Sequence, residues 1–164
     1  FLAPSGNEQT RVYLGSANGY SASSNIMFPD IPEFGITYTF QFVDFTSDGK
    51  IDVILNRVKH TNNPYGSYKL QFLRNDGNSF TDVTSQHVDR ATINLIGDAN
   101  NPPKWFDYLD QIDIDGDGYR DLVAGRGSYD SKGMTTNLPT TYTIPLWFSN
   151  KRGGYTGGTR VLTR

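Results

Sequence analysis

The sequence predicts an all-β fold of short antiparallel strands arranged as repeated units, and three observations lead to this expectation. Aromatic residues make up 13% of the chain and glycine occurs 17 times, so residues that favour strands and turns are both abundant. Turn dipeptides such as Asn18-Gly19, Asp48-Gly49 and Asp76-Gly77 separate short β-rich runs. No long stretch has a clear helical period, and two kinds of motif recur along the chain.

The first recurring motif is a strand, a glycine-containing turn and an aromatic residue that opens another strand. Its copies span residues 11–20, 70–80 and 145–155. The aromatic residues that end these copies, Tyr20, Phe80 and Tyr155, are 60 and 75 residues apart, which indicates an internal repeat. The first copy departs from the pattern, because Gly15 stands where the other two carry asparagine.

The most informative motif is the segment from Asp113 to Asp121. Aspartates occupy its positions 1, 3, 5 and 9, and position 7 offers a backbone carbonyl. Ca²⁺ takes six to eight oxygen ligands, and this arrangement supplies most of them. Four carboxylates within nine residues repel one another without a cation, which disfavours the alternative of an ordinary turn without metal. The predicted calcium ligands are Asp113, Asp115, Asp117, the Tyr119 carbonyl and Asp121.

The same motif occurs 69 residues earlier, from Asp44 to Asp52. Position 3 is Thr46 in this copy, so it offers three carboxylates and a hydroxyl or water, and we expect it to bind calcium more weakly. The alternative is a decayed loop that keeps only the turn. The candidate ligands of this loop are Asp44, Thr46, Asp48, the Lys50 carbonyl and Asp52.

Both segments also match the beginning of an EF-hand loop, which needs a bidentate glutamate at position 12 and a helix on each side. Position 12 is Ala124 in the later segment and Leu55 in the earlier one. The apolar run at 122–124 leads into Gly125 and indicates a buried strand. We therefore expect a calcium loop between two strands.

Together, these segments resemble the calcium-binding FG-GAP or VCBS repeats of integrin-like β-propellers. The resemblance rests on Asp-x-Asp-Gly-Asp-Gly-x-x-Asp-Leu at 113–122, its weaker partner at 44–53, and the Asn-Asp-Gly-x-x-Phe hairpin at 75–80. It covers nearly the whole chain and departs at Thr46, at Gly15 and in a long insertion at 128–143. It implies four-stranded antiparallel blades, each with its metal loop between the first and second strands.

The resemblance therefore predicts an all-β chain that is a β-propeller segment of roughly two to three blades. Residues 1–30 are expected to form a partial blade without its first strand and metal loop, because residues 1–4 align with the strand that follows such a loop. Residues 31–100 correspond to a complete blade with the degenerate loop, and 101–164 to a complete blade with the full loop. Propellers close with about four to eight blades. The expected partners are the remaining blades of a longer parent chain or other copies of this chain; an open stack of sheets is a third possibility.

The predicted function is a calcium-stabilised binding or adhesion module for a protein or glycan ligand. An extracellular, cell-surface or periplasmic location is expected, because moderate-affinity sites fill only where calcium is abundant. Two long loops, 57–68 and 128–142, contain tyrosines and polar residues that suit polar ligands. The formal net charge of −2 favours neither nucleic acid nor an anionic membrane as a partner, and no apolar run reaches membrane-spanning length.

No arrangement typical of an enzyme active site stands out in the sequence. His60 and His87 have no nucleophile and orienting acid near them in sequence, so both are expected at the surface. Asp107 and Asp110 precede the metal loop and could pair for acid–base chemistry, but they are expected as turn or strand-entry residues. The alternatives to a binding module are a part, catalytic or not, of a propeller polysaccharide lyase or other carbohydrate-active enzyme, and an architectural repeat of a surface assembly.

Overall fold

The computed structural model describes residues 9–32, 34–58, 68–88, 108–125, 141–150 and 153–163. Within these ranges the chain forms ten strands in three antiparallel sheets, together with the one-turn helix α1 (Thr84–His87). The all-β prediction is therefore confirmed. No helix in these ranges has the length and apolar character needed to cross a membrane.

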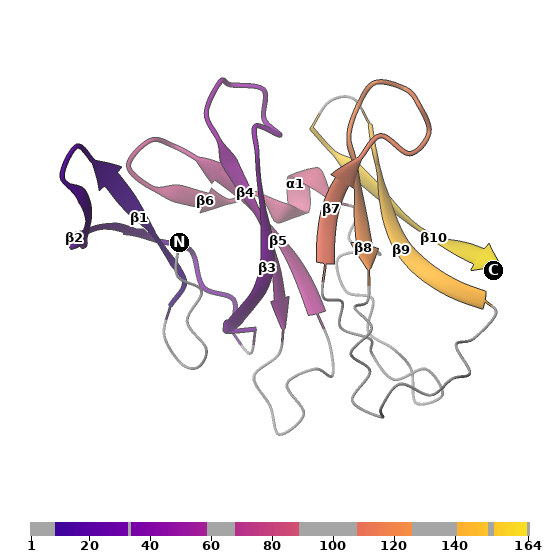
Figure 1. The fold of residues 1–164 in the computed structure, drawn as a ribbon, viewed down its shortest axis with the longest axis horizontal. Helices are drawn as coiled ribbons and strands as arrows, with labels where there is room; N and C mark the ends of the chain where they lie inside the picture. The colour runs from indigo at the N-terminus through magenta and orange to yellow at the C-terminus, as the bar shows by residue number, and fades with distance from the viewer. Residues whose placement is uncertain are drawn as a thin grey trace.

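The three sheets stand side by side in chain order and do not close into a ring over the described residues (Figure 1). The first sheet pairs β1 (Arg11–Ser16) with β2 (Gly19–Met27). The second contains, in spatial order, β3 (Ile36–Val43), β4 (Asp52–Val58), β5 (Tyr68–Asn75) and β6 (Phe80–Asp82). The third contains, in the same sense, β7 (Tyr108–Ile112), β8 (Asp121–Gly125), β9 (Thr141–Ser149) and β10 (Tyr155–Thr163).

The middle sheet is covered on both faces, which explains why all seven residues of β4 are buried. Alternate side chains of a strand point to opposite faces of its sheet. Ile54 and Val58 accordingly face the third sheet, whereas Val53 and Leu55 face the first. Apolar burial on both faces is the main attraction that stacks the sheets.

Two apolar clusters occupy the two spaces between the sheets. The cluster between the second and third sheets comprises Phe45, Ile54, Val58, Leu70, Phe72, Val83, Val88, Leu109, Leu122 and Tyr155. The cluster between the first and second sheets comprises Phe28, Val53, Leu55 and Leu73, with Val12, Phe40 and Phe80 at its margin. Each sheet is therefore fixed to its neighbour by a dry interface rather than by the connecting chain alone.

Arg57 is a fully buried cation in β4, with a side-chain exposure of 0%. Its Nε donates to Gln71 Oε1 at 2.6 Å, and its Nη2 donates to the Pro29 carbonyl at 3.1 Å. Burial lowers the pKa of the Arg57 guanidinium, while the charges of Asp30 and Asp82 oppose that shift. The guanidinium thus joins β4 and β5 to the segment that follows β2.

The burial of Arg57 corrects the predicted loop at 57–68. Arg57 and Val58 belong to β4, and Tyr68 begins β5, so both loop boundaries were wrong. The sequence does not reveal that Gln71 and the Pro29 carbonyl supply the partners of the buried Arg57. Tyr142 likewise lies in β9 rather than in the loop predicted at 128–142. The remaining parts of these two loops, 59–67 and 128–140, lie outside the described residues.

The second and third sheets also meet through polar contacts. From β3, the Gln41 side-chain amide donates to the Leu109 carbonyl of β7. Near α1, Nδ1 of His87 donates to the Gly153 carbonyl at 2.6 Å, and the His87 ring packs edge-on against Phe45 at 4.8 Å. Gly153 has a φ of 79° and lies so close to the Phe45 carbonyl that a side chain there would collide with it. The turn between β9 and β10 is thereby held against the second sheet.

Candidate metal centre

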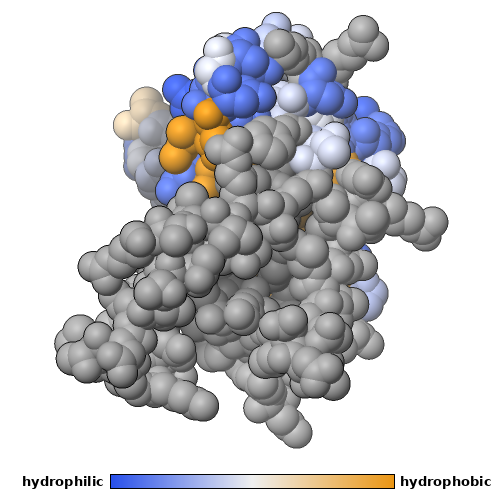
Figure 2. Space-filling model, turned by 90° about the vertical axis from the view of Figure 1, so that its right-hand side faces the viewer, coloured by the Kyte–Doolittle hydropathy of each residue, from blue (hydrophilic) through white to orange (hydrophobic). Residues whose placement is uncertain are grey.

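The segment from Asp113 to Asp121 connects β7 to β8, the first and second strands of the third sheet. The corresponding β3–β4 connection lies at the same end of the molecule, the upper end in Figure 1. The described residues at this end are mostly hydrophilic on the face seen in Figure 2. A strand, β8, follows the loop, so the prediction of a loop between two strands is confirmed and the EF-hand alternative is excluded.

Asp113 organises the backbone of this loop. Its Oδ1 accepts hydrogen bonds from the nitrogens of Gly116 (2.8 Å) and Asp117 (3.0 Å), and its Oδ2 accepts one from Gly118 (2.9 Å). The two glycines have φ angles of 77° and 88°, in the left-handed region that side chains disfavour. The alternation of aspartate and glycine therefore has a geometric cause: the chain must curl around one carboxylate.

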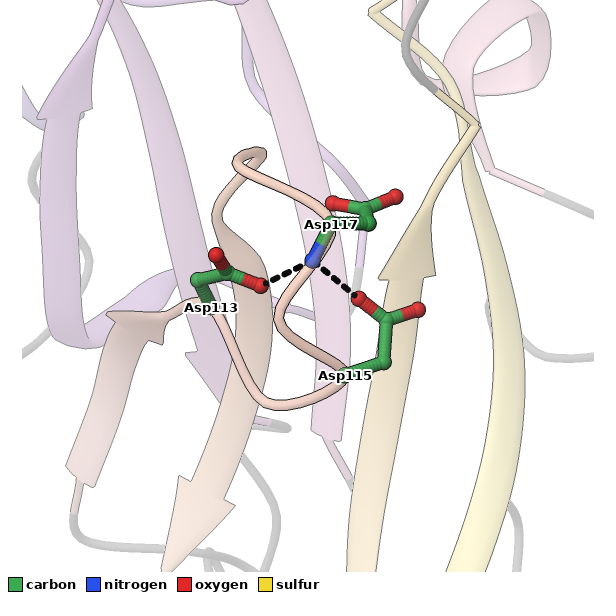
Figure 3. Close-up of side chains that lie close together, drawn as sticks. All are labelled: Asp113, Asp115 and Asp117. Atoms are coloured by element: carbon green, nitrogen blue, oxygen red, sulfur yellow. Dashed lines mark hydrogen bonds between the residues drawn. The ribbon is translucent and has the colours of Figure 1, made fainter.

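Three carboxylates of this loop converge. One ligand oxygen from each of Asp113, Asp115 and Asp117 lies within 4.8 Å of the others. Figure 3 shows the carboxylates of Asp113 and Asp115 both directed at the backbone nitrogen of Asp117, at 3.0 and 3.2 Å. A donor set made only of carboxylate oxygens suits hard cations such as Ca²⁺, and water or backbone carbonyls can complete the coordination. The residues present therefore fit a calcium ion.

Asp121, the fourth predicted ligand, lies outside this triad. It is 1% exposed; its Oδ2 accepts from the Ile114 nitrogen at 3.0 Å and its Oδ1 accepts from the Ser149 nitrogen at 2.8 Å. The carboxylate thus connects the loop to the end of β9. Tyr119, whose carbonyl was the fifth predicted ligand, donates its nitrogen to Asp117 Oδ1 at 2.9 Å, and 47% of its surface is exposed.

The Asp44–Asp52 loop repeats this architecture. Asp44 accepts from the nitrogens of Asp48 (3.1 Å) and Gly49 (2.8 Å), as Asp113 does from its equivalents. Asp52 is fully buried and accepts from Asn75 at the end of β5 at 2.8 Å, as Asp121 does from Ser149. In both loops the first carboxylate binds the loop backbone and the last binds the end of the third strand of the sheet. The alignment at an offset of 69 residues predicts that the two loops correspond, but not these bonds.

Two residues, Thr46 and Lys50, distinguish the earlier loop from the later one. The Thr46 hydroxyl donates to Asp52 Oδ2 at 2.9 Å, so it is engaged inside the protein. The Lys50 ammonium lies 2.7 Å from Asp48 Oδ2, and this hydrogen bond raises the pKa of Lys50 and lowers that of Asp48. In the part of the chain that the structure describes, the Asp113 triad is the one group of three or more acidic, histidine or cysteine side chains placed to hold an ion.

Neither the ion pair of Lys50 nor the burial of the acid at position 9 was predicted. The Lys50 carbonyl and the acid at position 9 were both predicted as metal ligands. A lysine among three acids is itself a signal of internal charge pairing. The signal for position 9 is its place at the start of the second strand of each sheet, since Asp52 begins β4 and Asp121 begins β8.

Of the other candidate residues, His87 and Asp110 fall within the described ranges, and neither belongs to the triad. His87 was expected at the surface but is half-buried against Phe45, as described above. Asp110 lies in β7 and is exposed, opposite Val123 of β8. His60, Asp107 and the strand expected at residues 1–4 lie outside the described residues.

Tyr155, at the start of β10, is buried in the cluster between the second and third sheets. Burial, with a smaller contribution from the charge of Asp121, raises the pKa of Tyr155 to about 12. The pKa in the unfolded chain is about 10, so the folded state holds the proton more tightly. Its contribution to stability is complete below pH 10 and is lost between about pH 10 and 12.

We therefore expect a loss of about 2 to 3 kcal/mol in the free energy of unfolding across this range. Urea denaturation of the wild type and of Tyr155→Phe, compared at pH 8 and pH 11, measures about half of this loss, roughly 1.4 kcal/mol. The Phe variant lacks this part of the alkaline loss, whereas Tyr119→Phe, at an exposed position, retains it. Equal losses in the wild type and Tyr155→Phe would contradict the assignment.

Comparison with known proteins identifies no relative: no family model, no curated protein and no solved structure gives a significant match to the chain.

Proposed function

We propose that the chain is a calcium-stabilised binding or adhesion module that works outside the cytoplasm. The observation that carries this proposal is the convergence of Asp113, Asp115 and Asp117 within 4.8 Å. Three carboxylates so close together repel one another, and a divalent cation relieves that repulsion. Calcium is the preferred ion because the donors are all oxygen and the loop is built from flexible turns.

Calcium would act as a brace in this module. The triad lies in the loop between β7 and β8, and the same loop is tied to β9 through Asp121 and the Ser149 nitrogen at 2.8 Å. An ion that fixes the loop therefore stabilises three neighbouring strands at once. Asp113, Asp115 and Asp117 would hold the ion, with the Tyr119 carbonyl as a further candidate.

We further propose that each four-stranded sheet is a blade of the FG-GAP or VCBS type and that the chain is a propeller segment. Three features support this proposal: both aspartate loops join first to second strands, the strands of each sheet follow chain order, and the sheets stack through apolar clusters. The exposed edges of open sheets favour pairing with further strands. The remaining blades of a parent chain, or other copies, are the partners that this proposal implies.

A protein or glycan is the proposed ligand class. An extracellular, cell-surface or periplasmic setting follows from the calcium proposal, because moderate-affinity sites fill where calcium is abundant. A glycan array together with an activity screen on carbohydrate substrates separates the classes of function. Binding without turnover supports a module, and turnover would support the enzyme alternative.

Removal of calcium is the direct test of the brace. We expect EGTA to lower the melting temperature of the calcium-loaded chain by roughly 5 to 10 °C, which corresponds to occupancy of one site at about a hundredfold excess over Kd. Added calcium should restore it. Circular dichroism melts with EGTA and with about 10 mM calcium measure the shift; this concentration is roughly a hundredfold above a Kd of about 0.1 mM, the tighter end of the range for extracellular sites.

Two alanine variants at matched loops provide the control. Asp117→Ala removes a member of the triad and should abolish the calcium-dependent shift. Thr46→Ala alters the earlier loop and should retain it. Identical melts of the wild type with and without calcium would contradict the proposal, and equal losses in both variants would contradict the assignment of the site to the later loop.

A further inference from the structure

The two aspartate loops differ in how their charge is balanced. Position 7 is Tyr119 in the later loop and Lys50 in the earlier one. The Lys50 ammonium lies 2.7 Å from Asp48 Oδ2, and the Lys50 backbone nitrogen donates to Asp48 Oδ1 at 2.9 Å. A single lysine thus engages both oxygens of the carboxylate at position 5.

The other two acids of the earlier loop are also engaged on both oxygens. Asp44 accepts from the nitrogens of Asp48 and Gly49. Asp52 accepts from the nitrogen and hydroxyl of Thr46 on one oxygen and from Asn75 on the other. Every carboxylate oxygen of this loop therefore has a donor within the protein.

The later loop contrasts at position 3. Among the described residues, Asp115 accepts one hydrogen bond, from the Asp117 nitrogen to its Oδ1 at 3.2 Å. Its carboxylate adds a charge where the earlier loop has the neutral Thr46. Three aspartates and Lys50 give the earlier loop a charge of −2 (−3 and +1), whereas four aspartates and Arg120 give the later loop −3 (−4 and +1).

We infer that Lys50 is the built-in counter-ion of the Asp44–Asp52 loop, so that this loop keeps its turn without metal and the chain takes up one divalent cation. The inference rests on the proposed calcium function of the later loop. A cation entering the earlier loop must displace the Lys50 ammonium from Asp48. It also finds three carboxylates there, one fewer than in the later loop. Lys50 therefore determines which of two similarly folded loops binds metal.

Calcium titration by isothermal calorimetry tests this inference on the full chain. The wild type should bind one equivalent. The double variant Thr46→Asp/Lys50→Tyr copies positions 3 and 7 of the later loop and should bind two. Adding Asp117→Ala should remove one equivalent from either background, because it disables the later loop.

If the double variant does not fold, a single substitution tests the same role of Lys50. Lys50→Met removes the ammonium and keeps the length of the side chain, so it should tighten calcium binding at the earlier loop by about tenfold and reveal a second, weaker binding event. In the reverse direction, Tyr119→Lys should weaken the later site by a similar factor, about tenfold.

The outcomes separate this inference from the proposed function. Two equivalents in the wild type would overturn the role of Lys50 and leave the calcium function standing. No binding in the wild type would overturn the proposed function and, with it, the inference. One equivalent in the wild type, in the folded double variant and in Lys50→Met would show that Lys50 does not exclude the metal.

Discussion

Replacing Asp52 with alanine should lower the free energy of unfolding by about 3 kcal/mol, with or without calcium, because it removes a fully buried acceptor and leaves three partly buried donors without it. Asp52 is 0% exposed and accepts hydrogen bonds from Thr46 (3.1 and 2.9 Å) and Asn75 (2.8 Å). These bonds join the β3–β4 loop to the end of β5. The substitution therefore removes the joint and also leaves two backbone N–H groups unsatisfied.

Urea denaturation measures the loss, and Asp48→Ala is the matched control. Asp48 belongs to the same loop, but its side chain is 34% exposed and its ion pair with Lys50 lies at the surface, so its loss is expected to be far smaller. Asp52→Asn keeps one acceptor oxygen and should fall between the two. If Asp48→Ala and Asp52→Ala shift the denaturation midpoint equally, the joint at Asp52 does not have the role described here.

Replacing Arg57 with alanine should lower the free energy of unfolding by about 3 to 5 kcal/mol, the range found when one partner of a buried polar network is removed. The guanidinium donates to Gln71 Oε1 and to the Pro29 carbonyl, and Gln71 in turn donates to Asp82 at 2.8 Å. Alanine leaves a cavity and removes the donor to Gln71 Oε1, whereas the Pro29 carbonyl keeps a second donor, Gln71 Nε2 at 3.0 Å. β4 thereby loses its connection through Arg57 to the segment that follows β2.

Two further variants identify the cause of the loss. Arg57→Met fills much of the space without the charge and should recover part of the stability, since apolar replacements in buried polar networks are often tolerated. Arg74→Ala removes an exposed arginine of β5, paired with Asp76 at 2.8 Å, and should change the urea midpoint little. An Arg57→Ala midpoint as close to the wild type as that of Arg74→Ala would contradict a structural role for the buried guanidinium.

The sequence predicts the parts of the fold that local chemistry controls. Gly19, Gly77 and Gly153 all have positive φ and all lie in the turns that the hairpin motif marks. The spacing of aspartates and glycines likewise predicts both loops, because each loop closes around its first carboxylate, Asp44 or Asp113, through bonds within five residues. Turns and short loops are readable because every partner lies nearby in the chain.

The features that the sequence does not predict depend on distant partners. Asp52 and Asn75 are 23 residues apart, and Asp121 and Ser149 are 28 apart, so the joint between loop and third strand is visible only in the folded chain. The burial of Arg57 depends on Pro29, 28 residues away. Both kinds of contact form only when distant strands and sheets pack together, and local sequence patterns do not contain that information.

Occupation of the Asp113–Asp117 triad by calcium is the central claim, and amide chemical shifts test it at the residues concerned. The nitrogens of Gly116 and Gly118 donate to Asp113, whereas that of Gly49 donates to Asp44 in the other loop. Calcium titration into ¹⁵N-labelled, metal-free chain should shift the Gly116 and Gly118 signals in proportion to occupancy and leave Gly49 unchanged. Unchanged Gly116 and Gly118 signals at millimolar calcium would contradict the account.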